Sequence, residues 1–186
     1  MFYMQHNLNV MQNLLNQDSI KVAQELLGNF LCRKIRKKIY KFKITETEAY
    51  EGLKDKASHA YRGRTKANEP MWAEAGTIYV YLIYGMYYML NIICGPKEHP
   101  SAVLIRGVEG VKGPGRLTKK ILIDKNFYNK KLGRKTGLWL ENNYTKEKII
   151  IKKAPRVGID YAGDKWSKKP YRFILVNDTS KEIYKH

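Results

Sequence analysis

The sequence is poor in cysteine and in acidic residues, and it has no long uninterrupted apolar segment. Cys32 and Cys94 lie far apart without metal-ligand spacing, so we expect reduced core thiols, no metal and no cofactor. The apolar run over residues 76–92 is too short to span a bilayer and is interrupted by Gly85. Because the start also lacks a signal-peptide pattern, we predict a cytoplasmic protein, nucleoid-associated if bacterial, without a membrane partner.

The shortage of acidic residues leaves a strongly basic chain. Against 17 Asp and Glu there are 35 Lys and Arg, which gives a net charge of +18 over 186 residues. Such an excess favours a polyanionic partner, most often nucleic acid. A genome biased toward Lys, Asn and Ile codons would produce the same excess without that partner. Hydrophobic residues make up 44% of the chain, so we expect one globular domain over residues 1–186, acting as a monomer.

The remaining patterns predict short helices and several strands. Residues 1–17 are polar and rich in Asn and Gln, so we expect them to be frayed. Asp18 is an N-cap for a short helix, and Gly28 stands where a left-handed C-terminal residue would. The rigid turn 113–115 leads into another helix start. Strands are expected over residues 30–35, 39–48, 101–108, 139–151 (strand, turn, strand) and 171–176.

Residues 76–92 form the densest apolar and aromatic run and predict a β-hairpin. Tyr79 and Tyr81 share one face, and β-branched and aromatic residues dominate. Gly85 can adopt the positive φ of a tight turn, which places Tyr84 at the tip. Tips are usually polar, so a ring at this position indicates an inserted or gripping side chain. The alternative is a buried hairpin whose turn packs under another element.

Two carboxylates follow the apolar face of the strand 39–48. A period of two places Glu46 and Glu48 on the same face as Phe42 and Ile44. Burial raises the pKa of a carboxyl group and makes it a better base near neutral pH. Alternatively, the strand ends there and its twist returns both groups to solvent or to arginine partners. The following loop carries His59 with Tyr and Arg residues and is typical of a site wall.

Basic residues occur in three further places. Arg106 lies within the apolar strand 101–108, and a buried arginine requires a carboxylate or a fixed water, for which Glu48 or Glu46 is the natural partner. The segment 33–43 has no acidic residue; it either touches phosphates or is a strand edge protected by lysines. We also expect contacts with a nucleic-acid backbone from Arg64, Arg116, Lys119 and Lys120.

Several stretches together resemble a known family. They are residues 46–50 (ETEAY), 57–59 (ASH), 76–91 and 113–119 (GPGRLTK), followed by 156–159 and 169–173. In order and spacing, from about residue 27 to 176, the chain resembles the alkyladenine (3-methyladenine) DNA glycosylases. The resemblance implies a single α/β (α+β) domain with a curved, mostly antiparallel sheet, flanking helices and a protruding β-hairpin. It also implies base excision repair: modified purines are flipped out of duplex DNA, and hydrolysis of the N-glycosidic bond leaves an abasic site.

The resemblance also assigns the chemistry. Glu48 would be the general base that activates water, and Arg106 and the backbone carbonyl of Val157 would help to hold that water. No lysine is placed for a Schiff base, so we expect a monofunctional enzyme without strand cleavage. The chain is short between Arg106 and Gly113, where some relatives carry an insertion, which leaves the range of lesions open.

The same resemblance places the base pocket and the wedge. Tyr50, His59 and Tyr81 would stack around the flipped base, and Asn91 would disfavour normal guanine through its 2-amino group. Tyr84 would enter the minor groove and fill the gap left by the flipped nucleotide. Chemistry on a base requires its removal from the stack, and aromatic wedges and walls offset that cost.

The hairpin register conflicts with this pocket. A two-residue loop of Tyr84 and Gly85 would pair Tyr81 with Tyr88 and place Asn91 on the opposite face from Tyr81. The resemblance places both residues in one pocket. We therefore predict a loop of odd length or a β-bulge.

Two other functional classes explain part of the sequence. A non-catalytic DNA-binding module with a wedging Tyr84 accounts for the charge and the hairpin but not for an inward Glu48. A carbohydrate glycosidase would use Glu46 and Glu48 as its carboxylate pair, although a basic surface is unsuited to a neutral glycan.

Overall fold

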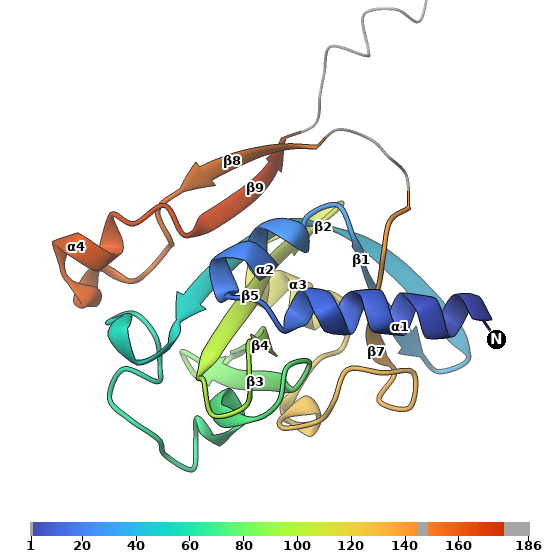
Figure 1. Cartoon of the computed structure of the whole chain (residues 1–186), viewed down its shortest axis with the longest axis horizontal. Helices are drawn as coiled ribbons and strands as arrows, with labels where there is room; N and C mark the ends of the chain where they lie inside the picture. The colour runs from blue at the N-terminus through green and yellow to red at the C-terminus, as the bar shows by residue number, and fades with distance from the viewer. Residues whose placement is uncertain (1, 145–148, 177–186) are drawn as a thin grey trace, which may run out of the picture.

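The computed structural model describes residues 2–144 and 149–176. One open sheet of nine strands, antiparallel in every pairing described, is flanked by four α-helices, which confirms the predicted fold class (Figure 1). The elements in chain order are α1 (Phe2–Leu15), α2 (Ser19–Glu25), β1 (Phe30–Ile35), β2 (Lys38–Glu51), η1 (Gly52–Lys54), η2 (Glu69–Trp72), β3 (Ile78–Ile83), β4 (Tyr87–Cys94), β5 (Ser101–Val108), β6 (Val111–Lys112), α3 (Pro114–Lys120), η3 (Lys125–Phe127), β7 (Leu138–Glu141), β8 (Ile150–Ala154), η4 (Asp160–Ala162), α4 (Asp164–Ser167) and β9 (Arg172–Val176).

The longest strand, β2, connects the two halves of the sheet. It pairs with β1 along its first half and with β5 and β9 along its second half. Its pairing with β5 shifts between Ile44 and Thr47, which marks a β-bulge. Beyond the bulge both faces of β2 are covered: the Thr47 hydroxyl donates to the Ala23 carbonyl of α2 at 2.7 Å, and the next side chain, Glu48, faces the other way. Glu48 therefore lies in a part of β2, residues 47–49, where consecutive side chains are buried on both faces.

The amino-terminal segment differs from its prediction. The expectation of a frayed stretch over residues 1–17 is wrong, because Phe2–Leu15 forms α1. Met11, Leu14 and Leu15 are buried against the core, and their spacing of three and four residues is that of a helical stripe. The Asn and Gln content of the segment concealed that stripe. By contrast, the cap of α2 is as predicted, since the Asp18 carboxylate accepts the Lys21 N–H at 2.9 Å.

The basic segment 33–43 forms the β1–β2 hairpin, and part of its charge is already engaged. Lys41 forms an ion pair with Glu141 at 2.5 Å, and the Arg33 guanidinium donates to the Ile121 carbonyl at 2.9 Å. The remaining basic side chains of the hairpin tip are exposed. This hairpin lies at the end of β2 remote from Glu48, ten residues from Lys38 along the strand.

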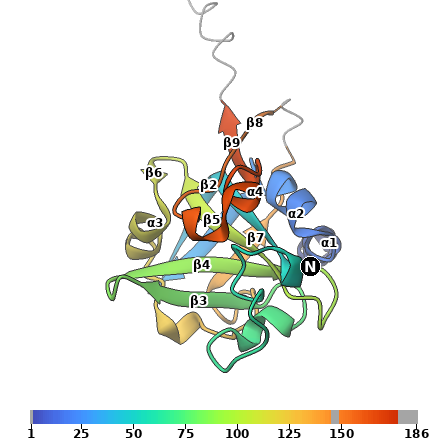
Figure 2. The ribbon, with the colours of Figure 1, turned by 90° about the vertical axis from the view of Figure 1, so that its left-hand side faces the viewer.

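The β3–β4 hairpin has the odd loop that the pocket requires. Ile83 pairs with Tyr87, so three residues, Tyr84, Gly85 and Met86, form the turn. Tyr84 and Gly85 both have positive φ, at 53° and 68°, and the Met86 N–H donates to the Ile83 carbonyl at 3.2 Å. The prediction of an odd loop or a bulge is therefore confirmed. Figure 2 shows the hairpin extending beyond α3, with its turn at the outer edge of the molecule.

Helix α3 supports the hairpin from one side. The Thr118 hydroxyl donates to the Tyr88 carbonyl of β4 at 2.8 Å. Gly115 lies so close to β4 that a Cβ atom at that position would be 2.8 Å from the Tyr87 ring. The glycine in the GPGRLTK stretch is needed for this close approach. Helix and hairpin consequently form one wall of the site.

A ribbon of β8 and β9 brings the carboxyl-terminal part of the chain back to β2. Figure 1 shows this ribbon leaving the body of the sheet, with α4 at its outer end. Arg172 of β9 pairs with Glu48 in the backbone register, and the loop between β8 and η4 therefore passes beside the end of β2. That loop contains residues 155–157. Both cysteines are free and buried, as predicted.

Candidate active site

A cavity of about 1210 Å³ opens where β2 ends. Its walls come from β2, the β3–β4 hairpin, β5, the loop after β2, the start of α3 and the loop after β8. The structure brings together most of the predicted site residues in this lining, namely Glu48, Tyr50, His59, Tyr81, Tyr84, Asn91, Arg106, Arg116 and Val157.

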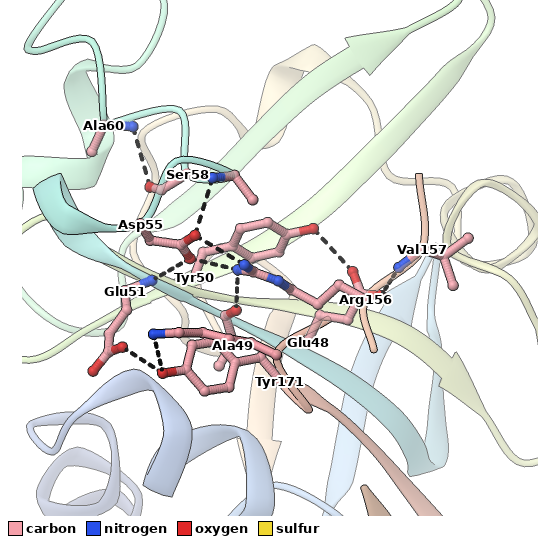
Figure 3. Close-up of polar contacts among 12 residues, drawn as sticks. Glu48, Ala49, Tyr50, Glu51, Asp55, Ser58, Ala60, Arg156, Val157 and Tyr171 are labelled. Carbon is pink, nitrogen blue, oxygen red and sulfur yellow. Dashed lines mark hydrogen bonds and ion pairs between the residues drawn. The ribbon is translucent and has the colours of Figure 1, made fainter. Parts of the chain in front are cut away.

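Glu48 is fully buried and both of its carboxylate oxygens accept hydrogen bonds. Oε1 accepts the Val157 N–H at 2.9 Å and lies 3.3 Å from the Arg106 guanidinium, while Oε2 accepts the Tyr50 hydroxyl at 2.9 Å (Figure 3). Burial raises the pKa of Glu48, and Arg106, the Val157 N–H and the Tyr50 hydroxyl act in the opposite direction. The result is a fixed carboxylate whose basicity exceeds that of an exposed glutamate.

Arg106 is held between two carboxylates, which confirms both of its predicted partners. Its Nε donates to Glu46 Oε1 at 3.0 Å, in addition to its contact with Glu48. Glu46 Oε1 also accepts from Arg172 at 3.1 Å. Because two guanidinium groups donate to the same oxygen of Glu46, this carboxylate is already engaged and is not placed as the second carboxyl group of a carbohydrate glycosidase.

Val157 approaches Glu48 through its amide. The predicted role of its carbonyl in holding water stays a prediction, because the contact with Glu48 is made by the N–H. The side chain of Val157 is half-exposed and lines the cavity mouth. A backbone N–H directed at a buried carboxylate stabilises the ionised form of that carboxylate, and so the loop 155–157 completes the site electrostatically.

Aromatic rings form another part of the cavity wall. The His59 and Tyr81 ring centroids are 4.4 Å apart, and those of Tyr79 and Tyr81 are 5.5 Å apart. His59 Nδ1 lies 2.7 Å from the Tyr79 hydroxyl, and partial burial lowers the pKa of His59, which favours a neutral ring. Asn91 pairs directly with Tyr79 across the hairpin and lies on the Tyr81 face, as the odd loop requires. Its Nδ2 donates to the carbonyls of Tyr79 and Met89 at 3.2 and 3.3 Å.

The residues that the prediction missed differ in how visible they are in the sequence. Tyr79 could have been found, because it alternates with Tyr81 on one strand face. Asp55 and Arg156 form a buried ion pair beside the cavity, with both side chains fully buried. They are 101 residues apart in the chain, and no local pattern connects an aspartate in a loop with an arginine after a strand.

The predicted contacts with the DNA backbone occupy different environments. Arg116 is exposed at the cavity rim, and Lys119 and Lys120 are exposed on the last turn of α3, outside the cavity lining. Arg64 also lies outside the lining and is already paired, at 2.6 Å from Glu69 and 2.8 Å from Glu98. A phosphate would have to compete with those carboxylates for Arg64, whereas the three basic residues of α3 have no acidic partner within residues 2–144 and 149–176.

The described part of the chain contains no cluster of three His, Cys, Asp or Glu side chains suited to a metal ion. Nor does it contain a helix long and apolar enough to cross a bilayer. The site thus consists of one buried carboxylate, one arginine and a set of aromatic rings, an arrangement suited to activating a water molecule beside a flat ligand.

Such a site on a basic α+β protein is that of a base-excising enzyme, and comparison with known proteins gives the family. The chain matches the family model described as Methylpurine-DNA glycosylase (MPG) over residues 13–112 and 110–179. It therefore belongs to the methylpurine-DNA glycosylase family, whose members act in DNA repair. This confirms the resemblance seen in residues 46–50 and 76–91.

Similar proteins from three bacteria cover most of the chain. The protein from Borrelia garinii subsp. bavariensis is 40% identical over 174 residues, covering 87% of this chain and 93% of its own. That from Clostridium perfringens strain 13 is 41% identical over 180 residues, covering 81% and 88%. That from Psychrobacter cryohalolentis is 39% identical over 173 residues, covering 77% and 81%. Each of the three carries the name "Putative 3-methyladenine DNA glycosylase".

Proposed function

We propose that this protein is a monofunctional, monomeric glycosylase that removes 3-methyladenine and related modified purines from duplex DNA. The observation that carries the proposal is Glu48: a fully buried carboxylate, held by three donors, at the wall of an aromatic cavity. Glu48 takes a proton from a water molecule, and the water oxygen forms a bond to C1′ of the sugar. The bond from C1′ to the purine nitrogen breaks, and its electron pair leaves with the purine.

The chemistry of the lesion contributes to the rate. A methylated purine carries a positive charge, and the departing electron pair neutralises it, so it leaves more easily than an unmodified base. A cationic ring also stacks favourably on electron-rich aromatic faces. Tyr81 and Tyr50 supply such faces in the cavity, and the neutral His59 adds no repulsive charge. Asn91 is tied to two backbone carbonyls, which makes it a rigid wall against the extra amino group of guanine.

The function is tested by release of free base. Duplex oligonucleotides containing 3-methyladenine, 7-methylguanine, hypoxanthine or ethenoadenine are incubated with the protein in EDTA, and the free base is measured by chromatography under single-turnover conditions. We expect release from at least one lesion, an abasic product that is cleaved only after alkali, and no adduct on borohydride treatment. Tight lesion binding without any released base would establish the non-catalytic DNA-binding module instead.

We further propose that Tyr84 enters the minor groove and occupies the space of the flipped nucleotide. Its side chain is 81% exposed at the turn of the β3–β4 hairpin, and the turn also borders the cavity. Base–aromatic stacking contributes roughly 1–3 kcal/mol per base, which helps to offset the cost of flipping.

Replacing Tyr84 with Ala is therefore expected to weaken binding to lesion-containing duplex by roughly 5- to 100-fold, as loss of one stacking contact implies. Thermal unfolding should barely change, because the ring packs on little of the protein. The measurement is fluorescence anisotropy at fixed salt. Tyr40→Ala is the matched control, since Tyr40 is 42% exposed on the remote half of β2. Equal effects of the two substitutions would reduce Tyr84 to a general surface contact.

A further inference from the structure

The ion pair between Asp55 and Arg156 is the most completely buried charged contact described near the cavity. Two guanidinium nitrogens of Arg156 donate to the two carboxylate oxygens of Asp55, at 2.5 and 2.9 Å, and both side chains have no solvent exposure. The family mechanism described above assigns no role to either residue.

Every remaining hydrogen bond of the two side chains reaches a segment that forms the active site. Arg156 also donates to the Ala49 carbonyl of β2 at 2.8 Å. Asp55 accepts the backbone N–H of Glu51 at 3.1 Å and that of Ala57 at 3.0 Å, two residues before His59. The pair thereby joins the end of β2, the pocket loop after it and the loop 155–157 (Figure 3).

Two of the three donors that hold Glu48 are immediate neighbours of Arg156. Val157, the next residue, donates its N–H to Oε1 of Glu48, and the Tyr50 ring, whose hydroxyl donates to Oε2, lies 4.8 Å from the guanidinium. Tyr171 lies against the same guanidinium at 5.3 Å. A shift of the Arg156 guanidinium would therefore displace the Val157 N–H from Oε1 of Glu48 and the Tyr50 hydroxyl from Oε2.

The plain alternative is that the pair only holds the fold together. Buried ion pairs are weak sources of stability, because the cost of desolvating two charges approaches their attraction, and apolar replacements are often equally stable. A bidentate, fully hydrogen-bonded pair is better suited to fixing geometry than to adding stability. One buried atom of the pair, Arg156 Nε, lacks a hydrogen-bond partner within the described residues, which is a further cost to stability.

We propose that Asp55 and Arg156 are positioning residues: their ion pair fixes the Val157 amide and the Tyr50 hydroxyl on the two oxygens of Glu48, and so orients the base for attack by water. The inference rests on the proposed function of Glu48. It predicts that a variant that disturbs the geometry of the ion pair, but keeps its charges, changes the rate of base release and its pH dependence. No residue that touches the substrate is removed in such a variant.

The pH dependence of base release is a measurement that would not change if Asp55 and Arg156 only stabilised the fold. Glu48 is faced by Arg106 from β5, Tyr81 from β3, Tyr161 from η4, and Tyr50 and Arg156. The Val157 N–H and the Tyr50 hydroxyl both lower the pKa of Glu48. Their displacement would raise the pKa of Glu48. The acidic limb of the pH–rate profile, where the rate falls because the base becomes protonated, would then move to higher pH.

Two charge-conserving variants test the proposal: Arg156→Lys, which cannot form the bidentate contact, and Asp55→Glu, which displaces the guanidinium. Base release from lesion duplex is measured under single-turnover conditions across pH, with lesion binding and thermal unfolding alongside. We expect the rate at neutral pH to fall about 10- to 100-fold, as for other small misplacements of catalytic groups, with the acidic limb at higher pH and binding nearly unchanged.

The matched control is Arg33→Lys. Arg33 is a partly buried arginine that, like Arg156, donates to backbone carbonyls, here those of Ile121 and Gly137, but it lies at the remote end of the sheet. We expect it to lower thermal stability without altering the rate or the pH profile. The proposal is overturned if Arg156→Lys retains the wild-type profile, if its rate loss only follows the unfolded fraction, or if neither variant folds. Failure of the wild-type protein to release any base would instead contradict the proposed function.

Discussion

Replacing Glu48 with Gln is expected to abolish release of modified bases while leaving lesion binding intact. General-base catalysis contributes about 10²- to 10⁴-fold, and an amide cannot take the proton from water. The fold should survive, because the Gln carbonyl can keep the bonds from the Val157 amide and Arg106, and the Tyr50 hydroxyl can rotate to accept from the new NH₂ group. The measurements are single-turnover release of a methylated purine and binding to duplex containing an abasic site.

Glu46→Gln is the control that distinguishes a mechanism with a single general base from one with paired carboxylates. Glu46 is two residues away on β2 and shares Arg106 with Glu48, but it does not hold the Val157 amide. We expect a much smaller loss of rate from this variant. If the two substitutions were equally damaging, a mechanism with paired carboxylates would be favoured over a single base, and undiminished turnover by Glu48→Gln would remove Glu48 from the chemistry.

Replacing Arg106 with Gln is expected to have the largest effect on stability. Its side chain is 13% exposed and contacts Glu46 and Glu48, so its loss leaves two carboxylates beside each other without their shared cation. Removing one partner of a buried ion pair costs about 3–5 kcal/mol of unfolding free energy, and exposure at the cavity wall reduces that figure. Base release should fall with it, because Glu48 would be ionised in fewer molecules at neutral pH.

The pH dependence of the unfolding free energy distinguishes the loss of the ion pair of Arg106 with Glu48 from a simple loss of packing. The folded-state pKa of Glu48 is already raised by burial, so folding favours its protonated form, and ionised Glu48 opposes folding as the pH rises. Without Arg106 the pKa rises further. The destabilisation should therefore be smaller near about pH 5 than near about pH 8 in denaturant titrations. Arg172→Gln, which contacts Glu46 but not Glu48, should show a weaker dependence, and a pH-independent loss for Arg106→Gln would point to packing alone.

Local patterns predicted the strands and the hairpin because each depends on neighbouring residues. Alternation located β1 and β5 with the observed ends, and the odd turn of the hairpin followed from requiring Tyr81 and Asn91 to share a face. The helix α1 was missed because its apolar stripe is sparse among Asn and Gln. Composition alone is a poor guide where only three or four positions of a helix touch the core.

Local sequence patterns could not predict most of the electrostatic surroundings of Glu48. A strand period of two placed Glu48 inward, and an apolar strand around Arg106 required a carboxylate partner. The Val157 amide and the ion pair of Asp55 with Arg156 depend on how β9 docks against β2, which only the complete sheet determines. Sequence thus located the carboxylate proposed to react, whereas the Val157 amide, one of the groups that act on its pKa, comes from the return of a distant segment.

The distance along the chain between Glu48 and its amide donor has a consequence for protein synthesis. The contact from Val157 joins residues 109 positions apart, and that between Asp55 and Arg156 joins residues 101 apart. A ribosome makes β2 and the β3–β4 hairpin long before the loop 155–157 exists. A nascent chain can thus present Tyr84 and the Glu48 carboxylate, but the contacts that hold this carboxylate through the loop 155–157 form only when the last strands have been made. On the proposed mechanism, late assembly of this kind keeps unfinished or truncated copies of the glycosylase inactive.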